Sequence, residues 1–271
     1  MRGLSRAGLV LGTGIVLGMA APARAAPDTV FATVSAPTVT APPPERPFLF
    51  IEDPSLPQPG HVLFSGGLGN VTQSGELRPV GGGPLVPNAG AEVGISPRVS
   101  VFARGDASFN GGGQNSQTRL GFEAGAHLLL TQPGVSRPLR LALQGGLGRD
   151  VNGAAVARLA AVGSWDQGPV RLAASVTASH DFNGAADGVD VTGALAASLR
   201  VRGGFRAGAE LVVQDLEESF GPAKEGGATG FAGPTLGWEW RHSLQFVAGP
   251  AVALVAGKPA VLARGTFNMT F

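Results

Sequence analysis

Ser179, His180 and Asp181 follow one another in the chain. These residue types form a nucleophile, a general base and an orienting carboxylate when their side chains hydrogen-bond in series. The surrounding stretch alternates in polarity, which predicts a β-strand, and neighbouring strand residues point to opposite faces. The three side chains are therefore not expected to meet. The four histidines are scattered, without the carboxylate–histidine spacing of a metal site, so we expect no cofactor, no metal and no enzyme.

Arginine and carboxylate residues recur at alternate positions along many stretches. In residues 205–213, Phe205 and Leu211 share one parity, whereas Arg206 and Glu210 share the other. A period of two places the two sets on opposite faces of a strand. The polar face holds the candidates for a solute path or an ion-pair network, and these are Arg104, Arg140, Arg158, Arg171, Arg200, Arg202, Arg206, Arg241, Arg264, Glu123, Asp190 and Glu210.

About 12 alternating stretches can be counted, each followed by a turn-rich connection. Their length suits tilted strands that cross a bilayer, which need about 9–11 residues. The pattern predicts an all-β fold, an antiparallel up-and-down transmembrane β-barrel of about 12 strands, with 10 or 14 also compatible. The expected strands are 61–69, 89–96, 98–108, 118–130, 138–149, 154–165, 169–181, 189–202, 204–214, 229–241, 243–254 and 259–271. Asp166-Gln167 and Gly203-Gly204 are among the expected short turns.

The composition narrows the class of protein. The chain has a net charge of +1 and only 14% charged residues, which argues against a nucleic-acid partner. It has no cysteine, so disulfides and thiolate metal sites are excluded. After residue 25 no apolar run reaches about 18 residues, so helical membrane spans are not expected.

The amino end has the pattern of a cleaved signal peptide over residues 1–25. Arg2 and Arg6 precede an apolar stretch over residues 8–21, and Ala23-Arg24-Ala25 is a small-x-small cleavage site. Residues 26–60 are rich in proline, which disfavours a β-ladder and favours an extended periplasmic segment. Within it, Phe48-Leu49-Phe50-Ile51 is an apolar cluster. Three roles stay open for this cluster: packing on the barrel rim, a plug in the lumen, or an extra strand.

The last nine residues, 263–271, alternate cleanly and end on an aromatic side chain. Their apolar set is Gly265, Phe267, Met269 and Phe271. This tail resembles the C-terminal signal of bacterial outer-membrane β-barrels, which the barrel-insertion machinery reads. Residues 61–271 resemble that superfamily in pattern, and no narrower family is identified. The resemblance implies contact with outer-membrane lipid, an outer-membrane location and both mature ends in the periplasm.

This topology places the aromatic residues at one level. A girdle at the periplasmic membrane boundary is expected from Trp165, Trp238, Trp240, Phe267 and Phe271. The absence of tyrosine is atypical for such a girdle.

By resemblance, the leading function is a narrow porin-like channel for passive diffusion of small solutes, with anions favoured by the surplus of arginine. One rival is a structural or adhesion-type barrel with partner-binding outer loops and no open pore, in which arginines pair with carboxylates. A remote rival is an outer-membrane enzyme that modifies lipids, and another is a secreted β-sandwich.

Overall fold

The computed structural model describes residues 46–71, 86–109, 118–131, 138–150, 153–182, 189–214, 216, 229–240, 243–255 and 258–271. The expected signal peptide over residues 1–25, the first part of the proline-rich segment over residues 26–45, and the candidate Arg241 lie outside the described residues. In the described part of the chain, no helix is long and apolar enough to cross a membrane.

The described residues form twelve β-strands, the number that the alternation predicts. They are β1 (Val62–Val71), β2 (Val86–Ser96), β3 (Val99–Phe109), β4 (Thr118–Leu129), β5 (Leu139–Arg149), β6 (Ala155–Gln167), β7 (Val170–Asp181), β8 (Asp190–Arg202), β9 (Phe205–Gln214), β10 (Thr229–Trp240), β11 (Leu244–Val255) and β12 (Lys258–Thr270).

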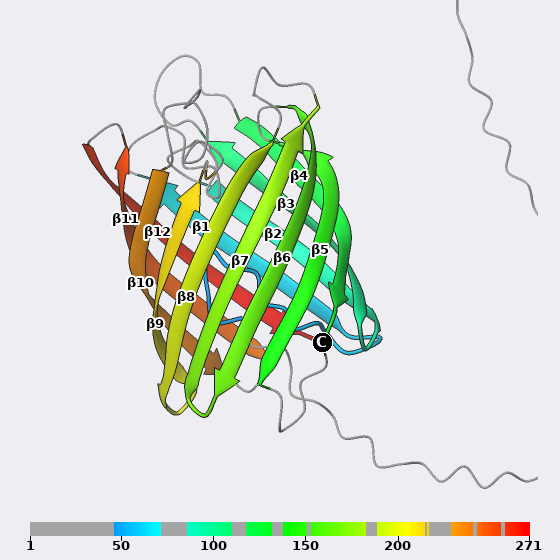
Figure 1. The fold of residues 1–271 in the computed structure, drawn as a ribbon, viewed down its shortest axis with the longest axis vertical. Helices are drawn as coiled ribbons and strands as arrows, with labels where there is room; N and C mark the ends of the chain where they lie inside the picture. The colour runs from blue at the N-terminus through cyan, green and yellow to red at the C-terminus, as the bar shows by residue number, and fades with distance from the viewer. Residues whose placement is uncertain are drawn as a thin grey trace, which may run out of the picture. The chain divides into compact units, whose positions relative to one another are not determined.

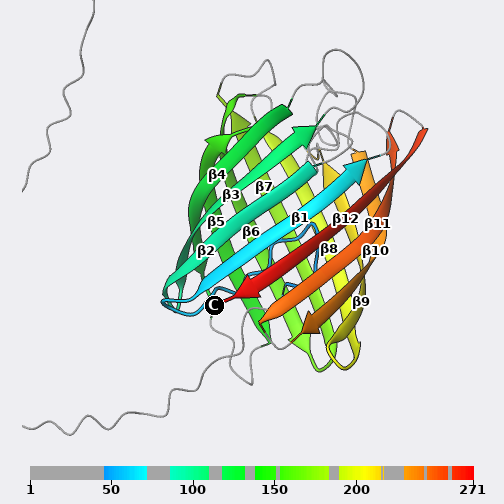
Figure 2. The same cartoon turned by 180° about the vertical axis from the view of Figure 1, so that it is seen from behind.

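Consecutive strands pair antiparallel, and β12 returns to pair with β1, so the sheet closes into a barrel. Figure 1 shows β5 to β8 along the near wall, and Figure 2 shows β1 to β4 and β12 on the opposite side. Closure removes the exposed edges that an open sheet would present. The predicted fold class and strand number are therefore confirmed.

The expected turn at Asp166-Gln167 is wrong by two residues. Both residues belong to β6 and pair with Arg171 and Val170 of β7. The chain reverses instead at Gly168-Pro169, where Gly168 has φ of 57°. Glycine adopts this left-handed conformation without a Cβ clash, which a two-residue hairpin loop requires. Asp166 therefore stays on a strand and faces the interior of the barrel, where it contacts Arg171.

The two faces of the strands differ in the predicted sense. The interior buries polar residues such as Ser100, Gln144 and Asn268. The exterior leaves large apolar side chains exposed, including Leu120 and Leu236, each 67% exposed. In water such an exterior would be an aggregation surface, whereas hydrocarbon covers it favourably. The exterior of the barrel is therefore suited to lie in the hydrocarbon of a membrane.

Residues 46–60 fold back into the barrel interior, and we call residues 46–58 the lumen segment. Figure 1 shows this stretch in blue inside the ring of strands. Phe48 and Ile51 are buried against Val162, Phe231 and Leu262 of the barrel wall. The segment leaves the interior beside β2, where Pro59 bridges Gly94 in parallel. Of the three open roles for Phe48–Ile51, the contacts correspond to a plug.

Candidate functional site

The lumen is the candidate site, because strand alternation directs the polar set inward from most of the strands. Arg104, Arg158 and Arg171, three of the lumen candidates, contact carboxylates across the interior. Two groups of side chains organise these contacts. The first lies on β3, β4 and β6, and the second lies on β5, β6 and β7.

The first group, the Glu123 cluster, comprises Glu123, Arg104 and Arg158. Arg104 donates to Glu123 Oε2 from Nε at 3.0 Å, and its Nη2 lies 2.9 Å from the same oxygen. Arg158 Nη1 donates to this oxygen as well. Gly146 of β5 makes room for the carboxylate, since a Cβ at that position would collide with Glu123 Oε1. Two guanidinium charges therefore meet one carboxylate charge.

The second group, the Asp166 cluster, comprises Asp166, Arg140 and Arg171. Arg171 binds Asp166 with two parallel hydrogen bonds, from Nε to Oδ1 at 2.5 Å and from Nη2 to Oδ2 at 3.1 Å. Arg140 Nη2 lies 3.4 Å from Asp166 Oδ2. Bidentate pairs of this kind fix the guanidinium plane. This cluster, like the first, contains one more positive charge than negative charge.

A third carboxylate, Glu92 of β2, is buried between polar neighbours. Ser100 Oγ donates to Glu92 Oε1 at 2.5 Å, and His127 Nδ1 lies 3.3 Å from the same oxygen. His127 is 1% exposed and is thus a buried residue of the interior, in contact with Glu92. Glu92 also forms an ion pair with Arg46 of the lumen segment.

The lumen segment contacts all three groups. Glu52 pairs with Arg104, and Asp53 Oδ2 accepts a hydrogen bond from Arg171 Nη1 at 3.0 Å. Arg140 Nη1 donates to Ser55 Oγ. These contacts connect residues far apart in the sequence, so the segment lies across the interior wall.

Sequence reasoning missed the charged residues of the lumen segment. Arg46, Glu52 and Asp53 flank the apolar Phe48–Ile51 cluster, and that proximity was the available signal. It could not separate a plug from a rim contact, because charged residues beside an apolar cluster are also common on surfaces. Asp166 was missed for a different reason, since it was assigned to a turn.

Two ionisable groups of the lumen segment are held in their charged forms. Burial alone would raise the pKa of the Glu52 carboxyl, but the Arg104 and Arg46 guanidiniums outweigh burial and lower the pKa to about 2. Burial alone would lower the pKa of Arg46, but Glu92, Glu52 and Asp53 outweigh it and raise the pKa. Arg46 and Glu52 are therefore both charged when the segment lies in the lumen.

Glu210 and Arg264 hold the tip of the lumen segment. The carboxylate of Glu210 is buried and accepts hydrogen bonds from the backbone N–H groups of Leu49 at 2.6 Å and Phe50 at 2.8 Å. The guanidinium of Arg264 lies over the Phe50 ring, 5.3 Å from its centroid. Both wall residues were predicted as lumen candidates, and here they contact protein.

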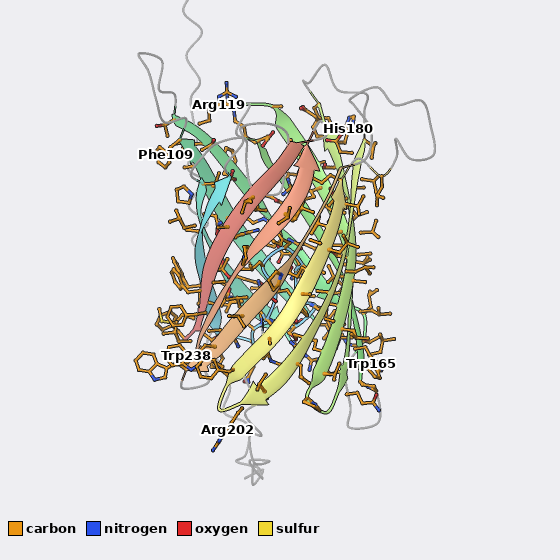
Figure 3. All side chains as sticks on the ribbon, turned by 90° about the vertical axis from the view of Figure 1, so that its left-hand side faces the viewer. Phe109, Arg119, Trp165, His180, Arg202 and Trp238 are labelled. Atoms are coloured by element: carbon orange, nitrogen blue, oxygen red, sulfur yellow. The ribbon has the colours of Figure 1, made fainter. Side chains whose placement is uncertain are left out.

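The remaining candidates lie near the ends of the barrel. Arg206 Nη1 donates to Ser198 Oγ at 3.4 Å, and Arg200 lies 3.8 Å from Glu239 with 44% of its side chain exposed. Arg202 is exposed and extends from the end of the barrel below the β8–β9 turn (Figure 3), so the structure does not place it in the lumen. Asp190 begins β8 at the opposite end.

The tryptophans of the expected girdle lie at one end of the barrel. Trp238 and Trp240 are exposed on the outer face, and Trp238 stacks with Phe205 and Phe246. Figure 3 places Trp165 near the same end, away from Phe109, Arg119 and His180.

The residues of the expected insertion signal lie on β12 and at the terminus beyond it. Phe267 lies over Gly66 of β1, where a Cβ would meet the ring at 2.6 Å. Gly265 and Met269 pair with Leu68 and Phe64 of the same strand.

No group of three or more potential metal ligands occurs among the described residues.

The chain is similar in structure to solved outer-membrane channels. No protein-family model matches the chain, and no curated protein matches it. A KdgM porin in complex with disordered oligogalacturonate is 12% identical with a TM-score of 0.51, over 76% of this chain and 99% of the porin. An outer-membrane channel from Pseudomonas putida F1 is 12% identical with a TM-score of 0.53, over 80% of this chain and 97% of the channel. The fold is thus that of porin-like outer-membrane barrels.

Proposed function

We propose that this protein is a narrow porin-like channel for passive diffusion of small solutes, with a preference for anions. The observation that carries the proposal is the composition of the two wall clusters inside a closed barrel. Each cluster surrounds one wall carboxylate with two arginines, and the acidic residues that balance the second arginine, Glu52 and Asp53, come from the lumen segment and not from these strands. Fixed positive charge in a narrow lumen attracts anions and repels cations.

The known ligand of one similar barrel is compatible with this proposal. The KdgM porin was solved in complex with oligogalacturonate, so that barrel holds a solute. Its 12% identity to this chain supports transfer of the fold but not of the solute.

A second candidate is a barrel without an open pore. The lumen segment favours this candidate, because it contacts both wall clusters and buries Phe48 and Ile51 in the interior. In this case the ion pairs would serve as interior packing, and function would lie in the outer connections.

Planar-bilayer recording separates the two candidates. We expect discrete current steps and, under a salt gradient, a reversal potential of the sign that indicates anion preference. Combining Arg200→Glu with Arg206→Glu should abolish or reverse this preference, because both residues lie near the mouth at the chain-terminus end. The matched control combines Arg98→Glu with Arg202→Glu, which makes the same change of charge at two exposed positions, one in a turn and one at the end of β8.

Recording at high salt separates the effect of the lumen variants from that of the control variants. At about 1 M salt the screening length is about 3 Å, so charges outside the lumen lose their influence on permeating ions. The lumen pair should then still change selectivity, whereas the control pair should not. Absence of current in every variant would instead identify a closed barrel.

A further inference from the structure

The lumen segment matches the wall in charge as well as in shape. In the Glu123 cluster two guanidiniums contact one wall carboxylate, and Arg104 also pairs with Glu52 of the lumen segment. In the Asp166 cluster two guanidiniums likewise contact one wall carboxylate, and Arg171 also pairs with Asp53 of the lumen segment. Consecutive acidic residues of one segment thus complete two separate clusters of the barrel wall.

The two contacts are made in the same way. Arg104 uses Nε and Nη2 for Glu123 on the wall and Nη1 for Glu52 of the lumen segment. Arg171 uses Nε and Nη2 for Asp166 on the wall and Nη1 for Asp53 of the segment. In both cases a wall carboxylate orients the guanidinium and leaves Nη1 directed at a second carboxylate. A preoriented guanidinium donor is suited to bind carboxylates in general.

Burial makes the second carboxylate necessary. The side chains of Arg171 and Asp53 are 4% and 1% exposed. A buried donor that loses its acceptor incurs a desolvation penalty unless water or another acceptor replaces it. The side chains of Arg104 and Glu52 are more accessible, at 33% and 32% exposed, so water can replace Glu52 there. When the segment leaves, Arg171 Nη1 loses Asp53 and Arg104 Nη1 loses Glu52, and a carboxylate of another molecule can take either position.

The backbone contacts of the segment indicate one discrete docked position. Glu210 accepts hydrogen bonds from two consecutive N–H groups of the segment, and Phe50 packs edge-on against Phe231 at 4.8 Å between ring centroids. These contacts set how far the segment inserts, and so they align Glu52 and Asp53 with their arginines.

We propose that the lumen segment is an internal competitor for a carboxylate-binding site that Arg104 and Arg171 form on the barrel wall. The ligand class is a small polycarboxylate anion, whose carboxylates take the positions of Glu52 and Asp53 and displace the segment. This inference rests on the proposed channel function for its biological setting, and it makes the segment an autoinhibitory contact. Competition between the anion and the lumen segment can be measured without recording ion currents.

The natural chain lacks cysteine, which provides a clean background for the test. In a Leu49→Cys variant, a water-soluble maleimide reports release of the segment, because Leu49 is 5% exposed when docked. Citrate serves as the polycarboxylate probe, and sodium chloride at equal ionic strength controls for screening. We expect citrate to accelerate labelling at least several-fold more than sodium chloride does. Equal acceleration by both salts would overturn competition by carboxylate.

The second arm removes the competitor. Glu52→Gln combined with Asp53→Asn, in the Leu49→Cys background, should accelerate labelling about tenfold without citrate. It should also tighten citrate binding about tenfold by calorimetry, because the arginine positions are vacated. The matched control combines Asp150→Asn with Asp181→Asn at the opposite end of the barrel and should behave as the parent. Unchanged citrate affinity in the double variant would refute the shared site, even if labelling increased.

Different results would refute the channel function and the carboxylate-binding site. If citrate binding and labelling respond as expected but no variant conducts ions, the carboxylate site stands and the channel function is wrong. If currents are anion-selective but citrate affinity is the same in all variants, the channel function stands and the competitor is wrong.

Discussion

A guanidinium has five N–H donors, and Arg171 divides them between two carboxylates from different parts of the chain. Asp166 belongs to the wall and Asp53 to the lumen segment. This one residue therefore couples the barrel to its plug, and the cost of losing it depends on burial rather than on the number of hydrogen bonds.

Replacing Arg171 with methionine should destabilise the protein by about 3–5 kcal/mol, the usual cost of breaking a buried ion pair. Arg171→Lys should recover part of this loss, since it keeps the charge but cannot form the bidentate fork. Denaturant unfolding of the reconstituted protein measures the difference. Arg98→Met, at an exposed turn, should change stability by less than about 0.5 kcal/mol. Equal effects at the two positions would contradict the coupling role of Arg171.

Docking of the lumen segment should weaken in acid. The pKa of Glu52 is about 2 when docked, against an ordinary value of 4.5, so the docked state binds fewer protons. Stability from this group is present above pH 4.5 and is lost as the pH falls toward 2. Linkage gives at most about a thirtyfold weaker docking at pH 3 than at neutral pH.

Hydrogen exchange of residues 46–58, read by mass spectrometry against an unfolded peptide at each pH, tests this expectation. Arg46, Arg104, Glu92 and His127 also act on Glu52, so the comparison variant is Glu52→Gln. The part of the acid response that disappears in Glu52→Gln belongs to Glu52. A response that is identical in parent and variant would exclude it.

At the scale of elements, glycines determine where chains can approach one another. At Gly94 of β2, a Cβ would collide with the backbone carbonyl oxygens of Pro57 and Gln58. Gly60 N–H donates to the Gly94 carbonyl at 2.8 Å, and Gly94 N–H donates to the His61 carbonyl at 3.1 Å. The lumen segment thus reaches β1 only because β2 has no side chain at this position.

Gly94→Val should displace the lumen segment while leaving the barrel closed, because the collision involves backbone of the segment that cannot rotate away. In the Leu49→Cys background, maleimide labelling should rise about tenfold, and resistance of the barrel to unfolding in detergent should persist. Gly145→Ala is the matched control, since its Cβ would meet only Leu159 at 4.0 Å. Labelling that stays at the parental rate in Gly94→Val would show that the segment docks independently of this crossing.

At the scale of the whole molecule, the barrel closes at its last residue. Phe271 N–H donates to the Val62 carbonyl at 2.9 Å, and Val62 N–H donates to the Phe271 carbonyl at 3.2 Å. These two hydrogen bonds extend the β1–β12 ladder to the chain terminus. Phe271 therefore has a structural role in closure besides its expected role as an insertion signal.

Deleting Phe271 should lower the fraction of folded barrel several-fold, because both closure hydrogen bonds and the terminal aromatic are lost. Phe271→Trp should retain most folding, and Phe271→Ala, which keeps the backbone bonds, should fall between the two. Heat-modifiable migration on gels measures the folded fraction in cells and after refolding in vitro. A defect of Phe271→Ala in cells but not in vitro would assign the side chain to the insertion machinery.

Much of the architecture could be read from the sequence because strand alternation is a local property. Phe205, Arg206, Leu211 and Glu210 show their faces by parity alone. The number of strands and the inward direction of Arg104 and Arg171 follow from the same periodicity once the sheet closes. The hairpin at Gly168-Pro169 was misplaced because several nearby residues could form a turn, and strand pairing decided among them.

The tertiary structure alone decided what the arginines contact. Asp53 is 118 positions from Arg171, and Glu52 is 52 positions from Arg104, so no local pattern connects them. Their pairing arises because barrel closure puts residues from different strands around one enclosed space, where a buried charge requires an opposite charge. Periodicity in the sequence determined which side chains face that space, and the packing of residues 46–58 within it determined their partners.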